Sequence, residues 1–278
     1  MTESITELIA GKIAESEFRL PVFNPVALEL QSVLDSELDM KTMEQLILRD
    51  PALASEILRV ANSAFFSGLA KLDSIHQALV RLGINQVFNI VMVASQRQAF
   101  SAKDAFLNGL MAELWRHASA SAGGCRWLSI KSGHRQLAEP AFLAGLLHDL
   151  GSLVILKVLD EILQQPDAPQ ITEAVIIELI ETLHARYGYK VMQSWQLPER
   201  YSEIARDHHL DACDDKNVLL QMVRLVDAAC RKLGIGLARE PDLVLEAVPE
   251  THLLGIKAVH LAELEIELEE FIEQLSGP

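Results

Sequence analysis

Histidine and aspartate residues able to bind metals recur through the second half of the chain. The sharpest pair is His148-Asp149, which lies within the apolar stretch 141–159, where an ionisable group is costly unless it is paired or ligating. The complete set of predicted metal ligands is His117, His148, Asp149, His184, His208, His209 and Asp227. Imidazole and carboxylate together suit iron, manganese or zinc better than calcium. We therefore predict a site for one or two divalent transition-metal ions.

Each candidate also has an ordinary structural interpretation. A buried histidine can simply bond a carbonyl, and Asp227 lies one turn from Arg224 and Arg231, so a salt bridge along the helix would explain it. Two metal ions a few ångström apart would instead activate water against a phosphate ester. In that case Asp149 and His184 are the candidates for catalytic roles.

Two glycines flank the His148-Asp149 pair. Gly145 and Gly151 each cost a helix about 1 kcal/mol relative to alanine. Their presence predicts that another helix, an ion or a substrate approaches the backbone closely at this point.

The elements that must position these residues are predicted to be helices throughout. Asp50-Pro51 offers a helix cap followed by proline, and Ser74 and Gly83 bracket a short helix. Later helices are predicted near 103–128, 141–159, 171–186, 188–196, 198–209 and 216–233. No stretch alternates like a β-strand, and no Asn-Gly or Asp-Gly pair lies between two strand-like stretches where it could form a hairpin turn. The predicted fold class is all-α.

Three regions are predicted along the chain. Residues 15–102 form an amino-terminal helical bundle, 103–233 form a helical core with most of the histidines, and 234–278 form a carboxy-terminal extension. The last segment carries a leucine stripe with one phenylalanine at three- and four-residue spacings: Leu261, Leu264, Leu268, Phe271 and Leu275. We expect an amphipathic helix packed on its own chain, with a partner or dimer contact as the alternative.

Composition narrows the function classes. A net charge of -15 argues against general binding to nucleic acid or anionic membranes, although it allows a local basic pocket. The three cysteines form no CxxC pair, which favours reduced thiols, and the amino terminus lacks the apolar core of a signal peptide. The stretch 141–159 approaches the length of a membrane span, but His148, Asp149 and Lys157 favour a helix buried in protein. We expect a soluble, cytoplasmic protein.

The order of these ligands resembles a known family. His117, His148-Asp149 and Asp227 follow the H…HD…D pattern of the HD superfamily of metal-dependent phosphohydrolases. The chain is most similar to the HDOD branch, the HD-related output domain of bacterial signalling proteins. The stretches that carry this resemblance are 20–34, 50–66, 74–91, 142–155 and 194–209, and together they are far more specific than an HD pair alone.

The resemblance implies a multi-helix HD-like bundle with an amino-terminal helical subdomain and a regulatory role. It also places His184, His208 and His209 at positions resembling extra ligands of the HD-GYP phosphodiesterases, which degrade cyclic di-GMP. Two departures argue against that activity. Ser152 stands where those enzymes carry a lysine that contacts phosphate, and no GYP signature follows His209.

The leading hypothesis is a stand-alone HDOD protein of bacterial signal transduction with a divalent-metal pocket. With no receiver or other signalling domain expected on the same chain, its input would come from a signalling protein partner or a small phosphorylated ligand. The alternatives are a metal-dependent phosphohydrolase acting on nucleotides or another phosphoester, and a non-catalytic protein-interaction module.

Overall fold

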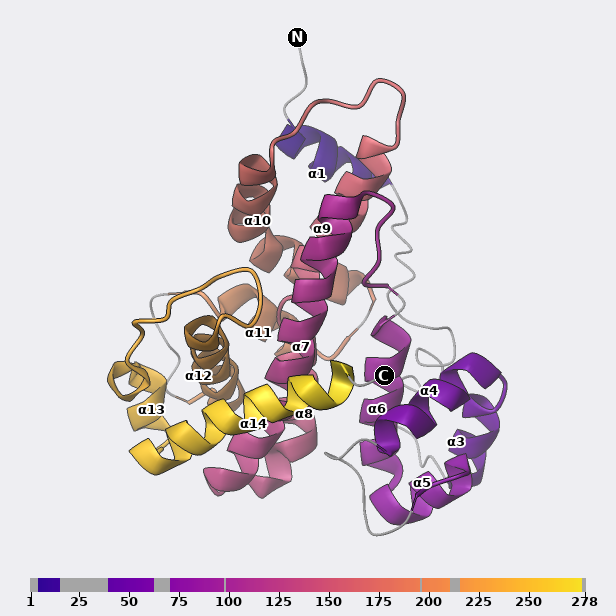
Figure 1. Cartoon of the computed structure of the whole chain (residues 1–278), viewed down its shortest axis with the longest axis vertical. Coiled ribbons are helices and arrows are strands. Elements are labelled where there is room, and N and C mark those ends of the chain that lie inside the picture. The colour runs from indigo at the N-terminus through magenta and orange to yellow at the C-terminus, as the bar shows by residue number, and fades with distance from the viewer. Residues whose placement is uncertain are drawn as a thin grey trace. The chain divides into compact units, whose positions relative to one another are not determined.

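The computed structural model describes residues 5–15, 40–62, 71–97, 99–195, 197–210 and 216–276, and these ranges are built of helices and their connections (Figure 1). No strand occurs within them, which confirms the all-α prediction. The family-like stretch 20–34 lies outside the described residues. The chain divides into two compact units: residues 1–20 with 100–268, and residues 21–99 with 269–278.

The second of these units contains four described helices, and capping residues mark the ends of two of them. They are α3 (Met40–Ile47), α4 (Pro51–Ala61), α5 (Ile75–Leu82) and α6 (Ile84–Arg97). The N–H of Leu53 donates to Asp50 Oδ1 at 3.0 Å, and the N–H of Gln77 donates to Ser74 Oγ at 3.2 Å. Gly83 ends α5 with φ +82°, a conformation that only glycine adopts freely. The predicted caps at Asp50, Ser74 and Gly83 are confirmed.

The unit formed by residues 1–20 and 100–268 carries all seven predicted ligands. Its helices are α1 (Ile5–Glu15), α7 (Ala105–Lys131), α8 (Ala138–Leu147), α9 (Leu150–Leu163), α10 (Glu173–Ser194), α11 (Glu199–Asp207), α12 (Val218–Leu233), α13 (Pro249–Leu253) and α14 (Ala258–Ser276, which belongs to this unit as far as residue 268). The buried carboxylate of Asp160 on α9 accepts the backbone N–H groups of Lys103 and Asp104 at 3.1 and 3.0 Å. This contact fixes the start of α7 against α9.

The prediction of one unbroken helix over 141–159 is wrong. Helix α8 ends at Leu147, α9 begins at Leu150, and His148-Asp149 forms the break between them. Asp149 adopts φ −101° and ψ 17°, and its carbonyl accepts the Ser152 N–H at 3.0 Å in a tight turn. The break turns both side chains out of a continuous helical stripe.

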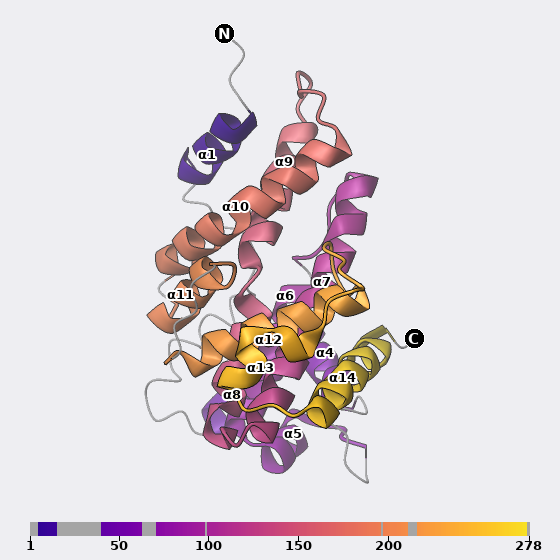
Figure 2. The ribbon, with the colours of Figure 1, turned by 90° about the vertical axis from the view of Figure 1, so that its left-hand side faces the viewer.

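Glycines let two pairs of helices, α7 with α8 and α9 with α10, approach at backbone distance, as predicted. A Cβ on Gly145 would lie 2.3 Å from the carbonyl oxygen of Ser121 on α7, and one on Gly151 would lie 1.8 Å from that of His184 on α10. Helices α9 and α10 accordingly run side by side in both views (Figure 2). The predicted interruption of the helix near residue 187 is wrong, because α10 continues through Gly188, which itself faces Gly151.

One stretch of the described residues, Arg135–Leu163, is long and apolar enough to cross a membrane by length and composition. In its most apolar window, 83% of the residues are buried inside the protein. That burial fits a core segment, because a spanning helix would present apolar side chains to lipid.

The leucine stripe of α14 packs on its own chain at its amino-terminal end. Leu261, Leu264 and Leu268 are almost fully buried. A Cβ on Gly124 of α7 would lie 2.7 Å from Leu268 Cδ2 and 2.9 Å from Val226 Cγ1 of α12, so these three helices meet at a small residue.

Candidate metal centre

The seven predicted ligands converge from five parts of one unit. His117 lies on α7, His148 and Asp149 lie in the break between α8 and α9, His184 lies on α10, His208 and His209 follow the end of α11, and Asp227 lies on α12. They form two groups, and within each group the ligand atoms all lie within 4.8 Å of one another. We call His117, His148 and Asp227 the inner group, and Asp149, His184, His208 and His209 the outer group.

The inner group is fully buried. His117 Nε2 lies 3.1 Å from His148 Nε2 and 3.5 Å from Asp227 Oδ1. The second oxygen of Asp227 faces Arg231, whose Nε lies 3.2 Å from Oδ2. The salt bridge along α12 that offered a purely structural explanation of Asp227 therefore exists, but it uses only one of the two carboxylate oxygens. Arg224 instead pairs with Glu250.

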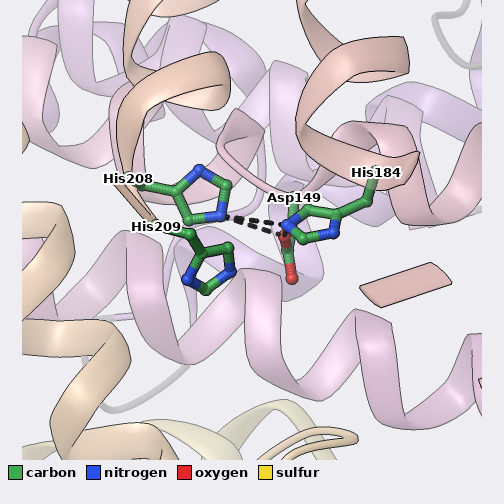
Figure 3. A group of neighbouring side chains, drawn as sticks. All are labelled: Asp149, His184, His208 and His209. Carbon is green, nitrogen blue, oxygen red and sulfur yellow. Dashed lines mark hydrogen bonds and ion pairs between the residues drawn. The ribbon is translucent and has the colours of Figure 1, made fainter. Parts of the chain in front are cut away.

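The outer group surrounds the carboxylate of Asp149 (Figure 3). His184 Nε2 and His208 Nε2 approach from opposite sides, lie 3.3 Å apart and each lie 3.5 Å from Asp149 Oδ1. The ring of His209 stacks at a tilt beside His208, with the ring centres 4.0 Å apart. His184 and His208 are buried while His209 is exposed, so this group extends from the interior to the surface.

Asp149 faces both groups. Its Oδ1 points to the outer histidines, whereas its Oδ2 lies 3.7 Å from Nε2 of His117 in the inner group. The helix break places this short side chain at the junction, since a residue inside a regular helix would present its carboxylate to one side only. Asp149 is thus the residue best placed to serve two ions at once.

Backbone carbonyls fix the orientation of four histidine rings. The Nδ1–H groups of His117, His148, His184 and His208 donate to carbonyl oxygens of Ile235 (3.1 Å), Gly145 (2.8 Å), Ile180 (2.8 Å) and Ala205 (2.9 Å), respectively. A carbonyl can only accept, so Nδ1 must carry the proton and Nε2 of each neutral ring is a bare acceptor. Metal-binding histidines in proteins are held in this way.

The donor set fits a bound cation. In each group two Nε2 atoms face each other at 3.1 or 3.3 Å, and two bare acceptors at that distance repel unless a proton or a cation lies between them. The buried Asp149 Oδ1 has no hydrogen-bond partner among the described residues. Buried acceptors without donors are rare in folded proteins. Here the acceptor atoms of the histidines and of Asp149 lie close together, as the ligands of a cation would.

The pKa values indicate which groups of this cluster carry a proton. Burial lowers the pKa of His148 to about 3, so its ring is neutral. Burial also acts to lower the pKa of His117, but Cys230, Asp149 and Asp227 outweigh it and raise the pKa to about 10. Against the cost of burial, the surrounding histidines hold the pKa of Asp149 and of Asp227 below its usual range. A proton on His117 Nε2 thus occupies the position that a metal would take.

A cavity of about 80 Å³ opens onto both groups. His117 and Asp227 line it from the inner group, and Asp149, His184 and His209 line it from the outer group. The apolar residues of the lining are Leu114, Ile177, Ile180, Ile235 and Leu237. Ligands could therefore reach the metal ligands from this side.

Sequence reasoning missed the segment after α12. Ile235 provides the carbonyl that orients His117, and Ile235, Leu237 and Ala238 cover one side of the cavity. Gly236 has φ +114°, and a Cβ there would lie 3.1 Å from Cβ of His117, so only glycine fits. A contact made by a backbone carbonyl does not require a particular side chain at position 235. Gly236 was therefore the only residue type in this segment that could have indicated the contact.

Comparisons with known proteins agree with this fold. The protein-family model of the HDOD domain matches residues 20–210. An uncharacterized protein of Treponema pallidum (strain Nichols) is 25% identical over 210 residues, which cover 73% of this chain but only 40% of that protein. This chain therefore spans well under half the length of that relative.

Two solved structures share the architecture. One, from Shewanella amazonensis SB2B, is described as a candidate metal-dependent phosphohydrolase; it matches with a TM-score of 0.75 at 21% identity, over 97% of this chain and 98% of that one. The other, from Marinobacter aquaeolei VT8, is described as a candidate signal transduction protein; it matches with a TM-score of 0.68 at 21% identity, over 97% of this chain and 64% of that one. At these identities the likeness establishes the fold.

Proposed function

Since this chain belongs to the HDOD domain family, we propose that it is a signal-transduction module whose inner and outer groups hold divalent transition-metal ions. The family and the description of the Marinobacter aquaeolei protein support the signalling role. Its input would be a signalling protein or a small phosphorylated ligand, and the cavity beside the two groups is the entry for the latter.

The observation that carries the metal proposal is the pair of opposed Nε2 atoms in each group. In the outer group the carbonyl-fixed rings of His184 and His208 present bare Nε2 lone pairs to each other and to Asp149. In the inner group only the Nε2 proton of His117 relieves the same repulsion between His117 and His148. A cation removes this repulsion and gives the orphaned Asp149 Oδ1 a partner. With only imidazole nitrogen and carboxylate oxygen on offer, iron, manganese and zinc are the metals of choice.

Elemental analysis of untagged protein, purified without chelator, tests the proposal. We expect one or two equivalents of a transition metal, lost in the double variant His148→Ala/Asp149→Ala. The matched control is His252→Ala/His260→Ala, which removes two histidines outside both groups and should leave the metal content unchanged. Wild-type protein that is metal-free and takes up none on reconstitution would refute the proposal and favour a pure interaction module.

A metal-dependent phosphohydrolase is the second candidate. Asp149 lies between two groups that share one cavity, and two ions so placed would hold a hydroxide and polarise a phosphate ester. His184 is held by the Ile180 carbonyl with Nε2 toward Asp149, which suits a ligand more than a mobile proton carrier. The description of the Shewanella amazonensis protein supports this candidate.

Hydrolysis of a panel of nucleotides, cyclic dinucleotides and simple phosphomonoesters tests the second candidate. Activity should require added metal and should vanish in Asp149→Asn. A blank panel from protein that demonstrably contains metal would count against hydrolysis and leave the signalling proposal standing.

A further inference from the structure

The cavity beside the two groups is lined by one guanidinium group. Among the described residues that line it, Arg231 of α12 is the only lysine or arginine. Ser152, at the position where the resemblance would place a phosphate-contacting lysine, lines the same cavity. The positive charge that position 152 lacks is therefore supplied to the cavity from another helix.

Arg231 is held by two carboxylates of different kinds. Its Nε faces Oδ2 of Asp227 at 3.2 Å, which leaves Oδ1 of Asp227 turned toward His117. Its Nη1 donates to Oε1 of Glu240 at 2.7 Å. Because a guanidinium carries five N–H donors in a planar fork, these two contacts do not exhaust it.

Glu240 belongs to the segment that covers the cavity. The Glu240 N–H donates to the Arg231 carbonyl at 2.9 Å, and the Ile235 N–H donates to the Cys230 carbonyl at 2.9 Å, so residues 235–240 are attached to α12 at both ends. Between these attachments Ile235, Leu237 and Ala238 line the cavity. The Glu240 side chain is about half exposed, with a relative accessibility of 48%, so it can leave Arg231 for water.

The charges around the cavity make anion binding depend on metal. Asp149, Glu181 and Asp227 contribute three carboxylates to the lining, against the guanidinium of Arg231 and the protonated ring of His117. Without bound cations this lining is negative and repels an anion, whereas two divalent ions would reverse the sign of the local charge. An anion in the cavity would then lie near both the bound ions and Arg231.

We propose that Arg231 is the residue that binds the oxyanion of a phosphate-class ligand in this cavity, and that Glu240 occupies Arg231 until the ligand displaces it. The inference rests on the proposed metal function. It adds the residue that recognises the ligand, Arg231, and the structural change that reports binding, the release of Glu240. Displacement of the Glu240 carboxylate removes the side-chain contact between residues 235–240 and Arg231, so occupancy of the cavity loosens the exposed end of this segment, residues 238–240. Because a ligand must displace Glu240, only ligands that compete with its carboxylate for the Arg231 guanidinium should bind.

Calorimetric titration of inorganic phosphate into metal-loaded protein tests this. We expect phosphate to bind, and Glu240→Gln to tighten binding about two- to fivefold, because an exposed ion pair that competes with the ligand is removed. Asp242→Asn removes an exposed carboxylate two residues away and is the matched control, with unchanged binding expected. Arg231→Gln should weaken binding about tenfold or more, because a charge-assisted contact is lost. Arg239→Gln, an exposed arginine of the same segment, should have no effect.

Hydrogen exchange of residues 235–240 supplies a second readout. Phosphate should increase exchange there in the wild type and have a smaller effect in Glu240→Gln, which already lacks the side-chain ion pair with Arg231. Metal content measured on every sample separates the two proposals. Metal-loaded protein that binds no phosphate, or for which Glu240→Gln binds no more tightly than wild type, would overturn the role of Arg231 and Glu240 while leaving the metal site intact. Wild-type protein without metal would refute the metal proposal, and phosphate binding to it that ignores Arg231→Gln would overturn this inference as well.

Discussion

The inner and outer groups use the same side-chain chemistry in different surroundings. The inner group is buried and carries a proton on His117, whose pKa of about 10 reflects Cys230 and the two aspartates prevailing over burial. The outer group reaches the surface at His209, whose pKa falls to about 4 because part of its ring is shielded from water and His208 lies beside it. One group must therefore release a proton to bind metal, whereas the exposed ring of the other is already neutral.

This difference indicates a division of labour. A buried site suits an ion that stays, and a site that opens to solvent suits an ion that exchanges or meets a ligand. Asp149 couples the two because each of its oxygens faces one group. Changes at Asp149 should therefore act on both groups, and changes elsewhere on one.

The largest effect is expected from Asp149→Asn. An amide cannot supply two anionic oxygens, so both groups should lose affinity and the metal content should fall below one equivalent. Metal analysis after dialysis checks this, with Asp242→Asn as the exposed control. Retention of a full complement of metal by Asp149→Asn would show that the two groups do not share this residue.

Next in size are losses confined to one group. His117→Ala should abolish metal at the inner group and spare the outer one, and His209→Ala should do the reverse. Each removes a direct ligand, so the affected site should weaken by more than the ~10–100-fold that loss of an outer-sphere partner costs. Titration with a competing chelator resolves the two sites. Identical isotherms for both variants would mean that the groups act as one site.

Glycine substitutions should affect the same two groups through the backbone. Gly145→Ala forces α8 away from α7 and disturbs the inner group, whereas Gly151→Ala forces α9 away from α10 and disturbs the outer group. Each should cost at least about 1–3 kcal/mol of unfolding free energy, the usual cost of overpacking. Denaturant unfolding measures this cost. Gly109→Ala on α7 meets nothing within 4 Å and should instead stabilise by up to about 1 kcal/mol. Equal stability of all three variants would contradict the close helix approach.

The smallest expected effect is a difference in pH dependence. His117 is protonated in the metal-free protein below pH 10, so its proton must leave, and inner-group affinity should rise up to about tenfold per pH unit between about pH 7 and 9. His209 is already neutral over this range, so the outer group should show a shallower slope. Chelator competition at three pH values, with His209→Ala reporting the inner group and His117→Ala the outer one, measures both slopes. A steeper slope for the outer group would reverse the assignment.

Much of the fold was predictable because its signals are local. Caps such as Asp50 and Ser74 act within one turn of their own helix, and the absence of strand patterns fixed the class. The break at His148-Asp149 was not predictable, since apolar residues on both sides favour helix and only the tertiary contacts of Gly145 and Gly151 distinguish two segments from one.

The candidate site was predictable in its residue types but not in its arrangement. All seven residues were identified by chemistry in apolar surroundings, and the structure brings all seven together. Their division into two groups depends on distances between helices, which spacing along one chain does not determine. The contacts of the Ile235 carbonyl and of Glu240 could not be predicted, because the first is made by the backbone and the second joins residues nine positions apart across the end of α12.

Anomalous diffraction from crystals of the metal-loaded protein, collected on both sides of the metal absorption edge, tests the central claim most directly. We predict two peaks, one among His117, His148 and Asp227 and the other among His184, His208 and His209, with Asp149 between them. Their separation should be about 3.5–4 Å, as in other two-metal sites. A map that shows no peak in the inner group and none in the outer group, from crystals grown with the metal in excess, would contradict the account.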